Sequence, residues 1–291
     1  MSDSFMLLLV KDKTGIIDPR TRFMIYRQTN SNIPTSLLSC TTSPFSASML
    51  CYIGNGATGN NWGHGYYGRD HGDDNSVAAD GTRRATFGLY PAGGRFDNNN
   101  ALTVNNTNIT NSAQGAGVLN ILDYSFVNFM LAELAITEPG VTGDPLTLLN
   151  TAVDANINKV MNFNTAISGT FPTTATIASP TIVTNYKNAV SARYTAAIGN
   201  EKLNTVIKEF FIASFGNGME AYNMYRRTGM PLQNAGNIGM QTSINPAYAA
   251  PASFNYSFPY PSNAVNNNSN IIQHNNQTKV FWDNNPSTLI N

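Results

Sequence analysis

The sequence predicts a mainly α-helical protein whose helices lie between two long irregular segments. In residues 117–230, apolar side chains recur every three or four positions, the spacing that places them on one face of a helix. Residues 1–116 and 231–291 are instead rich in Gly, Asn, Ser and Pro, which favour turns and loops. We therefore expect one unit over 1–291, made of a loop-rich segment, a helical segment and an irregular C-terminal segment.

Only short elements are expected before residue 117. The apolar run Met6–Val10 is typical of a strand or of a helix end, and Arg22–Arg27 is typical of a short strand. Between them, Asp18-Pro19 marks a turn. Glycine-rich clusters follow at 54–72 and 90–97. Long loops inside a domain are usually functional or disordered, and the aromatic residues in these clusters argue against plain disorder.

Start signals divide the helical segment into separate helices. Asp144 and Ser179 each precede a proline, so each combines an N-cap acceptor with a residue that suits the first helical turn. Asn200 is the expected cap of a further helix, which we expect to be interrupted around Gly216–Gly218. Helices this close in sequence are expected to pack as helical hairpins. The predicted spans are 118–136, 145–162, 180–197 and 201–227.

The composition limits the classes of ligand. Lys plus Arg and Asp plus Glu both number 17, so the formal net charge is zero, which argues against nucleic-acid binding. Asn makes up about one residue in seven, and there are 13 Tyr. A surface rich in amides and phenols suits uncharged, hydroxyl-rich ligands. The two cysteines, Cys40 and Cys51, are too few for a zinc site and are compatible with either a disulfide or two free thiols.

The loop that begins at Trp62 is the best candidate for a ligand site. Aromatic rings stack on the C–H faces of sugar rings, while charged and amide groups bond to hydroxyls. Glycines between these residues allow a tight backbone around one aromatic platform. The alternative is that the aromatic residues anchor a long loop on the helices and that the polar run has a structural role. The candidate ligand-binding residues are Trp62, Tyr66, Tyr67, Arg69, Asp70 and His71.

Metal-dependent and hydrolytic functions have weaker support. The spacing of the acidic and amide residues in the same loop differs from that of an EF-hand, although their oxygens could hold a hard cation. No metal and no cofactor are expected. The sequence has no GxSxG, HExxH or phosphate-binding glycine motif. Its few Glu residues fall on predicted helices or their ends, and any two of them could meet in the folded chain, so the alternative of a glycosidase stays open. The residues considered for the cation are Asp70, Asp73, Asp74, Asn75 and Asp80.

Several motifs in a fixed order resemble those of a known family. Residues 211–222 read Phe-Ile-Ala-Ser-Phe-Gly-Asn-Gly-Met-Glu-Ala-Tyr, and residues 225–231 read Tyr-Arg-Arg-Thr-Gly-Met-Pro. In the tail, residues 258–266 read Phe-Pro-Tyr-Pro-Ser-Asn-Ala-Val-Asn, and residues 279–283 read Lys-Val-Phe-Trp-Asp. Together with 18–20, 68–72 and 90–94, they resemble the SusD/RagB nutrient-binding outer-membrane lipoproteins, in particular the SusD-like subgroup.

The resemblance implies a helical, tetratricopeptide-like scaffold with long ligand-binding loops. It also implies a non-catalytic protein at the cell surface that binds an oligosaccharide, or a peptide, and delivers it to a SusC-like TonB-dependent transporter. Because family members are longer chains with a lipoprotein signal, this sequence resembles their C-terminal portion. The alternatives are a glycan-acting hydrolase and a structural or adhesive surface protein.

Two expectations follow for the core and for the ligand site. If further helices normally pack against this portion, the chain alone should expose an apolar patch and associate with rising concentration. The residues expected to lie in that patch are Phe126, Phe129, Val153 and Tyr186. Trp62 is expected to anchor the aromatic platform, because the other tryptophan, Trp282, lies in a tail motif typical of packing. We also expect Arg226 and Arg227 to pair with carboxylates such as Glu220 or Asp283.

Overall fold

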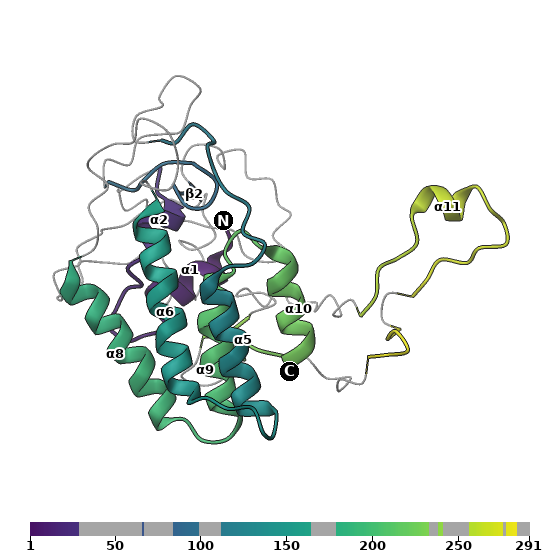
Figure 1. Cartoon of the computed structure of the whole chain (residues 1–291). Helices are drawn as coiled ribbons and strands as arrows, with labels where there is room; N and C mark the ends of the chain where they lie inside the picture. Colours follow the sequence, from purple (N-terminus) through teal and green to yellow (C-terminus); the bar gives the residue numbers. More distant parts are fainter. Residues whose placement is uncertain are drawn as a thin grey trace, which may run out of the picture.

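The computed structural model describes eight parts of the chain, and the following statements concern these residues. Most of the described residues that form regular structure lie in helices, which confirms the predicted fold class (Figure 1). The helices are α1 (Asp3–Val10), α2 (Thr21–Met24), α5 (Tyr124–Thr137), α6 (Pro145–Met161), α8 (Pro180–Ala196), α9 (Asn200–Ala213), α10 (Gly218–Thr228) and α11 (Ser262–Asn266). The described parts are residues 1–28, 66, 84–98, 112–163, 179–232, 238–240, 256–275 and 278–283.

Helices α6 and α8 follow their predicted start signals, whereas the predicted cap of α9 was wrong: its N-cap is Gly199, no side chain caps it, and Asn200 is its first residue. The side chain of Asp144 accepts a hydrogen bond from the backbone N–H of Thr147 at 2.9 Å and begins α6. The Ser179 hydroxyl caps α8 in the same way. The first long helix begins later than predicted, at Tyr124, because Asp123 accepts a hydrogen bond from the N–H of Phe126 and so fixes the start of α5.

The predicted interruption of the last helix is also present. Helix α9 ends at Ala213, and α10 begins at Gly218 with Asn217 as its N-cap, 3.0 Å from the N–H of Glu220. Gly216 lies between the two helices at φ 92°, and a Cβ there would come within 2.4 Å of the Pro91 ring. Only glycine fits this close approach, so the turn brings the loop around Pro91 against the helices.

The N-terminal segment contains more helix than the sequence indicated. Met6–Val10 belongs to helix α1, and the predicted strand at Arg22–Arg27 is divided between helix α2 and strand β1 (Ile25–Tyr26). Strand β1 pairs antiparallel with strand β2 (Thr86–Phe87), in a register that places Ile25 opposite Phe87. This two-stranded sheet lies at one end of the helix layer (Figure 1).

Helices α5, α6, α8 and α9 form the main body of the described structure, and α10 lies beside α9 (Figure 1). Their core contains three phenylalanines in contact: Phe129 stacks on Phe210 with ring centroids 5.2 Å apart, and Phe126 meets Phe210 edge-on at 5.3 Å. Val153 and Tyr186 are also buried, each about 1% exposed. The four residues expected to form an exposed patch therefore all lie inside the core, so that expectation was wrong about which residues are exposed.

Candidate functional site

The structure describes one of the six predicted ligand-binding residues. Tyr66 is fully buried, and its hydroxyl donates a hydrogen bond to Asp97 Oδ2 at 3.2 Å. The guanidinium of Arg27 lies over the Tyr66 ring, 4.7 Å from its centroid, and also bonds Asp97 at 2.6 Å. Burial, followed by the Asp97 charge, raises the pKa of Tyr66 well above its usual value. In this structure the Tyr66 ring leaves no surface for a ligand.

The remaining predicted site residues lie outside the described residues, and their assignment to a ligand platform stays a prediction. They are Trp62, Tyr67, Arg69, Asp70 and His71. The acidic and amide residues considered for a cation, Asp70, Asp73, Asp74, Asn75 and Asp80, also lie outside, as do Cys40 and Cys51. Among the residues that the structure does describe, no group of three or more His, Cys, Asp or Glu is arranged to hold a metal ion.

A densely charged group of residues is buried between the N-terminal segment and the helices. Arg20, which is fully buried, bonds Asp18 Oδ2 at 2.6 Å and Asn156 Oδ1 of α6 at 2.6 Å. The same guanidinium donates to the Tyr186 hydroxyl of α8 at 2.9 Å. Tyr186 in turn donates to Glu209 Oε2 of α9 at 2.7 Å. One arginine therefore links three helices to the turn after α1.

A second set of ion pairs continues from this arginine. Lys13 Nζ lies 2.7 Å from Glu209 Oε1, and Lys208 Nζ lies 2.7 Å from Asp12 Oδ1. Arg193 of α8 also pairs with Asp12. Burial lowers the pKa of Lys208 to about 8, against the opposing effect of Asp12. We call the whole set the buried charged cluster; it comprises Asp12, Lys13, Asp18, Arg20, Tyr186, Arg193, Lys208 and Glu209.

The buried charged cluster has the geometry of a structural ion-pair network and not that of a catalytic site. Each carboxylate faces a cation within ion-pair distance, and the side chains of Asp12, Asp18 and Arg20 have no exposed surface. A catalytic carboxylate needs access to substrate, whereas these groups hold the N-terminal segment against α8 and α9. Glu209, which the sequence left open as a possible acid or base, is one of them. Glu133 is likewise paired, through a bidentate contact of 2.7 Å to Arg227.

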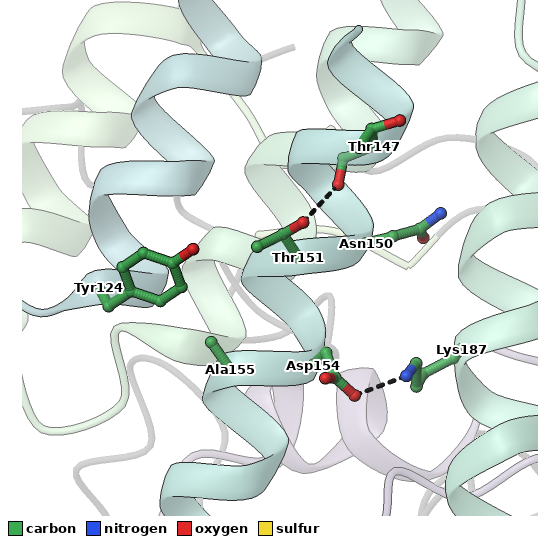
Figure 2. Close-up of a pocket in the computed structure, with 7 residues that line it drawn as sticks. All are labelled: Tyr124, Thr147, Asn150, Thr151, Asp154, Ala155 and Lys187. Carbon is green, nitrogen blue, oxygen red and sulfur yellow. Dashed lines mark hydrogen bonds and ion pairs between the residues drawn. The ribbon is translucent and has the colours of Figure 1, made fainter. Parts of the chain in front are cut away.

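An open pocket of about 550 Å³ lies on the surface formed by α6, α8 and the start of α5 (Figure 2). Tyr124, whose side chain is 67% exposed, forms one wall. Thr147, Thr151 and Asp154 line it from α6, and Lys187 reaches it from α8. The pocket therefore places one aromatic ring beside hydroxyl, carboxylate and ammonium groups. The sequence alone does not reveal this pocket, because its polar residues resemble those of any solvated helix surface.

The polar groups of this pocket already bond to one another or to their neighbours. The Thr151 hydroxyl donates to the Thr147 carbonyl at 2.8 Å, and Lys187 pairs with Asp154 at 2.5 Å, as Figure 2 shows. Asn150 Oδ1, also in the lining, accepts from a serine hydroxyl of α8. A ligand would meet the tyrosine ring and the hydrogen-bonding capacity that these contacts leave over, including N–H groups of Lys187 and Asn150. The pocket chemistry is compatible with weak binding of a neutral, hydroxyl-bearing molecule.

A second pocket of about 590 Å³ lies between the ends of α5, α9 and α10. Its lining combines apolar side chains, among them Leu134, Leu203 and Met230, with the ion pair of Arg227 and Glu133.

The predicted pairing of the adjacent arginine is confirmed, since Arg226 lies 3.2 Å from Asp283. Arg227 contacts Glu133 of α5, a partner that the sequence did not indicate. Within the part of the chain that the structure describes, no helix combines the length and apolar character needed to cross a bilayer.

Comparison with known protein families gives a match over a large part of the chain. A family model described as SusD-like, starch-binding and associating with the outer membrane matches residues 74–256, which is more than half of the chain. No curated protein and no solved structure matches. The matched residues include helices α5, α6, α8, α9 and α10 and the pair of Arg227 and Glu133. With its mainly helical fold and this match, the chain belongs to the SusD-like family of starch-binding proteins that associate with the outer membrane.

Proposed function

We propose that this protein binds an oligosaccharide at the outer-membrane surface without transforming it and passes it to a SusC-like TonB-dependent transporter. The family match over residues 74–256 carries the proposal, because the family consists of binding proteins associated with the outer membrane. The zero net charge and the abundance of Asn and Tyr agree with an uncharged, hydroxyl-rich ligand. Anchoring as a surface lipoprotein is part of the same proposal.

The proposed ligand site is the loop that contains Trp62, Tyr67, Arg69, Asp70 and His71. Aromatic stacking on the sugar face, together with hydrogen bonds from the charged edges, gives modest affinity, because exposed hydroxyls exchange water bonds for protein bonds. Tyr66 has a different role in this proposal. Its buried contacts to Arg27 and Asp97 fix one point of the loop to the body of the protein.

The central test compares two aromatic substitutions in the whole chain. Glycan-array screening, extended to a peptide panel, identifies the ligand, and calorimetry measures its affinity. Stacking on one ring contributes on the order of 1 kcal/mol or more, so Trp62→Ala should weaken binding roughly tenfold. Tyr124→Ala is the matched control, because Tyr124 is an exposed aromatic residue in the pocket of Figure 2, and it should leave affinity unchanged.

The outcomes separate the possible sites and functions. Lost affinity in Tyr124→Ala with unchanged affinity in Trp62→Ala would move the site to the pocket of Figure 2. Unchanged affinity with a lowered melting temperature in Trp62→Ala would make that tryptophan a packing residue. Release of shorter sugars from the bound oligosaccharide, abolished by a single carboxylate substitution, would establish a hydrolase instead. Co-purification with a SusC-like transporter tests the delivery step.

A further inference from the structure

The pocket between the ends of α5, α9 and α10 has the size and the lining of a small-molecule site. Its volume of about 590 Å³ lies within the range of about 300–1,000 Å³ that is usual for ligand pockets. Most of its inner surface is apolar, and few charged groups line it, as in most such sites. The three helix ends lie at the end of the helix layer away from β1 and β2 (Figure 1). The apolar lining residues are Met130, Leu134, Leu203 and Met230.

Most polar groups of this lining already have partners. Arg227 donates two hydrogen bonds to Glu133, each of 2.7 Å. The hydroxyls of Thr137 and Thr228 each donate to a backbone carbonyl of their own helix. Glu138 differs, because it takes part in none of the ion pairs that the described residues form. Its carboxylate can therefore accept hydrogen bonds from a ligand.

The charges of the lining favour a cation over an anion. The lining contains the carboxylates of Glu133 and Glu138 but only one guanidinium, that of Arg227. The hydrogen bonds to Glu133 raise the pKa of Arg227 against the opposing effect of burial, and the charges of Glu133 and Glu220 raise it further. Because two carboxylates already stabilise this guanidinium, an anionic ligand would gain less from it and would meet their repulsion.

The helix ends add to this preference. Carbonyl groups at the C-terminal end of a helix have partial negative charge and favour a cation nearby. The last turn of α5 contains no basic residue, and its C-cap is Glu138. The partial positive charge at the start of α9 is met by Glu201 in its first turn. Lys202 of the same helix lies over the Tyr194 ring, 5.4 Å from its centroid, and is not part of the lining.

We propose that this pocket binds a small organic amine, with its ammonium group beside Glu138 and its apolar body against Leu134 and Leu203. Leu134 is 41% exposed and lies one helical turn before Glu138, so the two side chains are neighbours on α5. The carboxylate accepts hydrogen bonds from the ammonium group, and the apolar body covers the leucine. An exposed ion pair alone contributes little in water, and apolar surface alone does not select a charge. The site does not involve the loop that begins at Trp62, so it is independent of the proposed function.

The first experiment titrates the whole chain with hexylamine, hexanol and hexanoate, and ligand-observed NMR measures their affinities. Hexylamine should bind about fivefold more tightly than hexanol, the effect of one well-placed ion pair, and hexanoate should bind more weakly than hexanol. Added salt should reduce the advantage of hexylamine. Equal affinity of the three probes, or no binding of hexylamine, would overturn the proposal. If hexanoate bound most tightly, the pocket would be a carboxylate site at Arg227 instead.

The second experiment locates the amine with variants at two exposed positions of α5, and circular dichroism verifies that the variants are folded. Glu138→Gln should lower the affinity for hexylamine to that for hexanol, because it removes the charge and keeps the shape. Leu134→Gln should weaken binding of both probes about threefold, because it removes apolar surface from the lining. Glu201→Gln is the matched control, since it removes a carboxylate near the same helix ends but outside the lining. It should bind hexylamine like wild type.

Each variant can contradict the proposal. A preference for hexylamine that survives in Glu138→Gln, or that Glu201→Gln loses to the same extent, would show that the ammonium group does not lie beside Glu138. Unchanged affinities in Leu134→Gln would place the probes outside this pocket.

Discussion

The buried charged cluster and the outer face of α5, formed by the exposed residues Tyr124, Val127, Leu131 and Leu134, reverse the usual distribution of polarity. Arg20 and Asp18 have no exposed surface, whereas Leu131 and Val127 are each 40% exposed. Burying a charge is unfavourable unless an opposite charge and hydrogen bonds meet it, and the cluster supplies both. The comparison shows that partner groups, more than polarity, decide what this chain buries. The following predictions test that comparison, in order of expected effect.

Breaking the buried charged cluster should give the largest loss of stability. Arg20→Met leaves Asp18 buried without its ion-pair partner and leaves Glu209 with Lys13 alone, and such a loss typically costs about 3–5 kcal/mol. Lys187→Met is the matched control, because the pair of Lys187 and Asp154 is exposed and should contribute less than about 1 kcal/mol. Urea denaturation measures the free energy of unfolding of both variants and adds no salt that would screen the ion pairs. Equal losses in the two variants would contradict a special role for the cluster.

Two positions on α5 should respond differently to truncation. Phe129→Ala removes a ring that is fully buried against Phe210 and should lower the free energy of unfolding by about 3–5 kcal/mol. Leu131→Ala, two residues away on the outer face, should cost about 1 kcal/mol or less at a concentration where the chain is monomeric. A larger effect at Leu131 under those conditions would show that its face is packed within a single copy.

Acid should destabilise the protein through the cluster. Burial alone would raise the pKa of Asp18, but the Arg20 guanidinium outweighs it and holds that pKa below its usual value. The pKa of Asp12 is also lowered, because the charges of Lys13, Lys208 and Arg193 outweigh the effect of burial. In the unfolded chain these two carboxyls bind protons at a higher pH than in the folded chain. Their contribution to the free energy of unfolding is therefore complete above about pH 5 and is lost as the pH falls below about 4.

Unfolding experiments from pH 7 to pH 2 test this sign. The loss of stability at low pH should be smaller in Asp18→Asn, which starts less stable at pH 7 and has one fewer carboxylate to protonate. If wild type and Asp18→Asn lost stability in parallel over the whole range, the acid sensitivity would originate outside the cluster.

The smallest expected effect concerns Tyr66. Tyr66→Phe keeps the buried ring beneath Arg27 and removes only the hydrogen bond to Asp97, which should cost about 1 kcal/mol. Glycan affinity, measured by calorimetry, should not change, since the ring is fully buried. A clear loss of affinity with unchanged stability would show that Tyr66 contacts the ligand after all.

Local signals in the sequence predicted the helices well. Asp144 and Ser179 begin helices in the structure, and the glycine-rich interruption before α10 is present, because capping and backbone freedom depend on neighbouring residues. The start of α5 was misplaced because Leu119 and Leu122 continue the apolar spacing. The Asp123 cap makes the helix begin at Tyr124, so both leucines lie before the helix and are exposed.

The sequence by itself determined the helical class and the family motifs, and it offered Asp283 as one of two possible partners for the two arginines at the end of α10. The tertiary structure alone decided which apolar and charged residues are buried. Arg20 and Glu209 meet although 189 residues separate them, and Tyr66 reaches Asp97 across a long stretch of chain. Such partners depend on how helices and loops pack, and periodicity predicts an apolar face without specifying which neighbour covers it. That is why Phe129 lies in the core while Leu131, on the same helix, remains exposed.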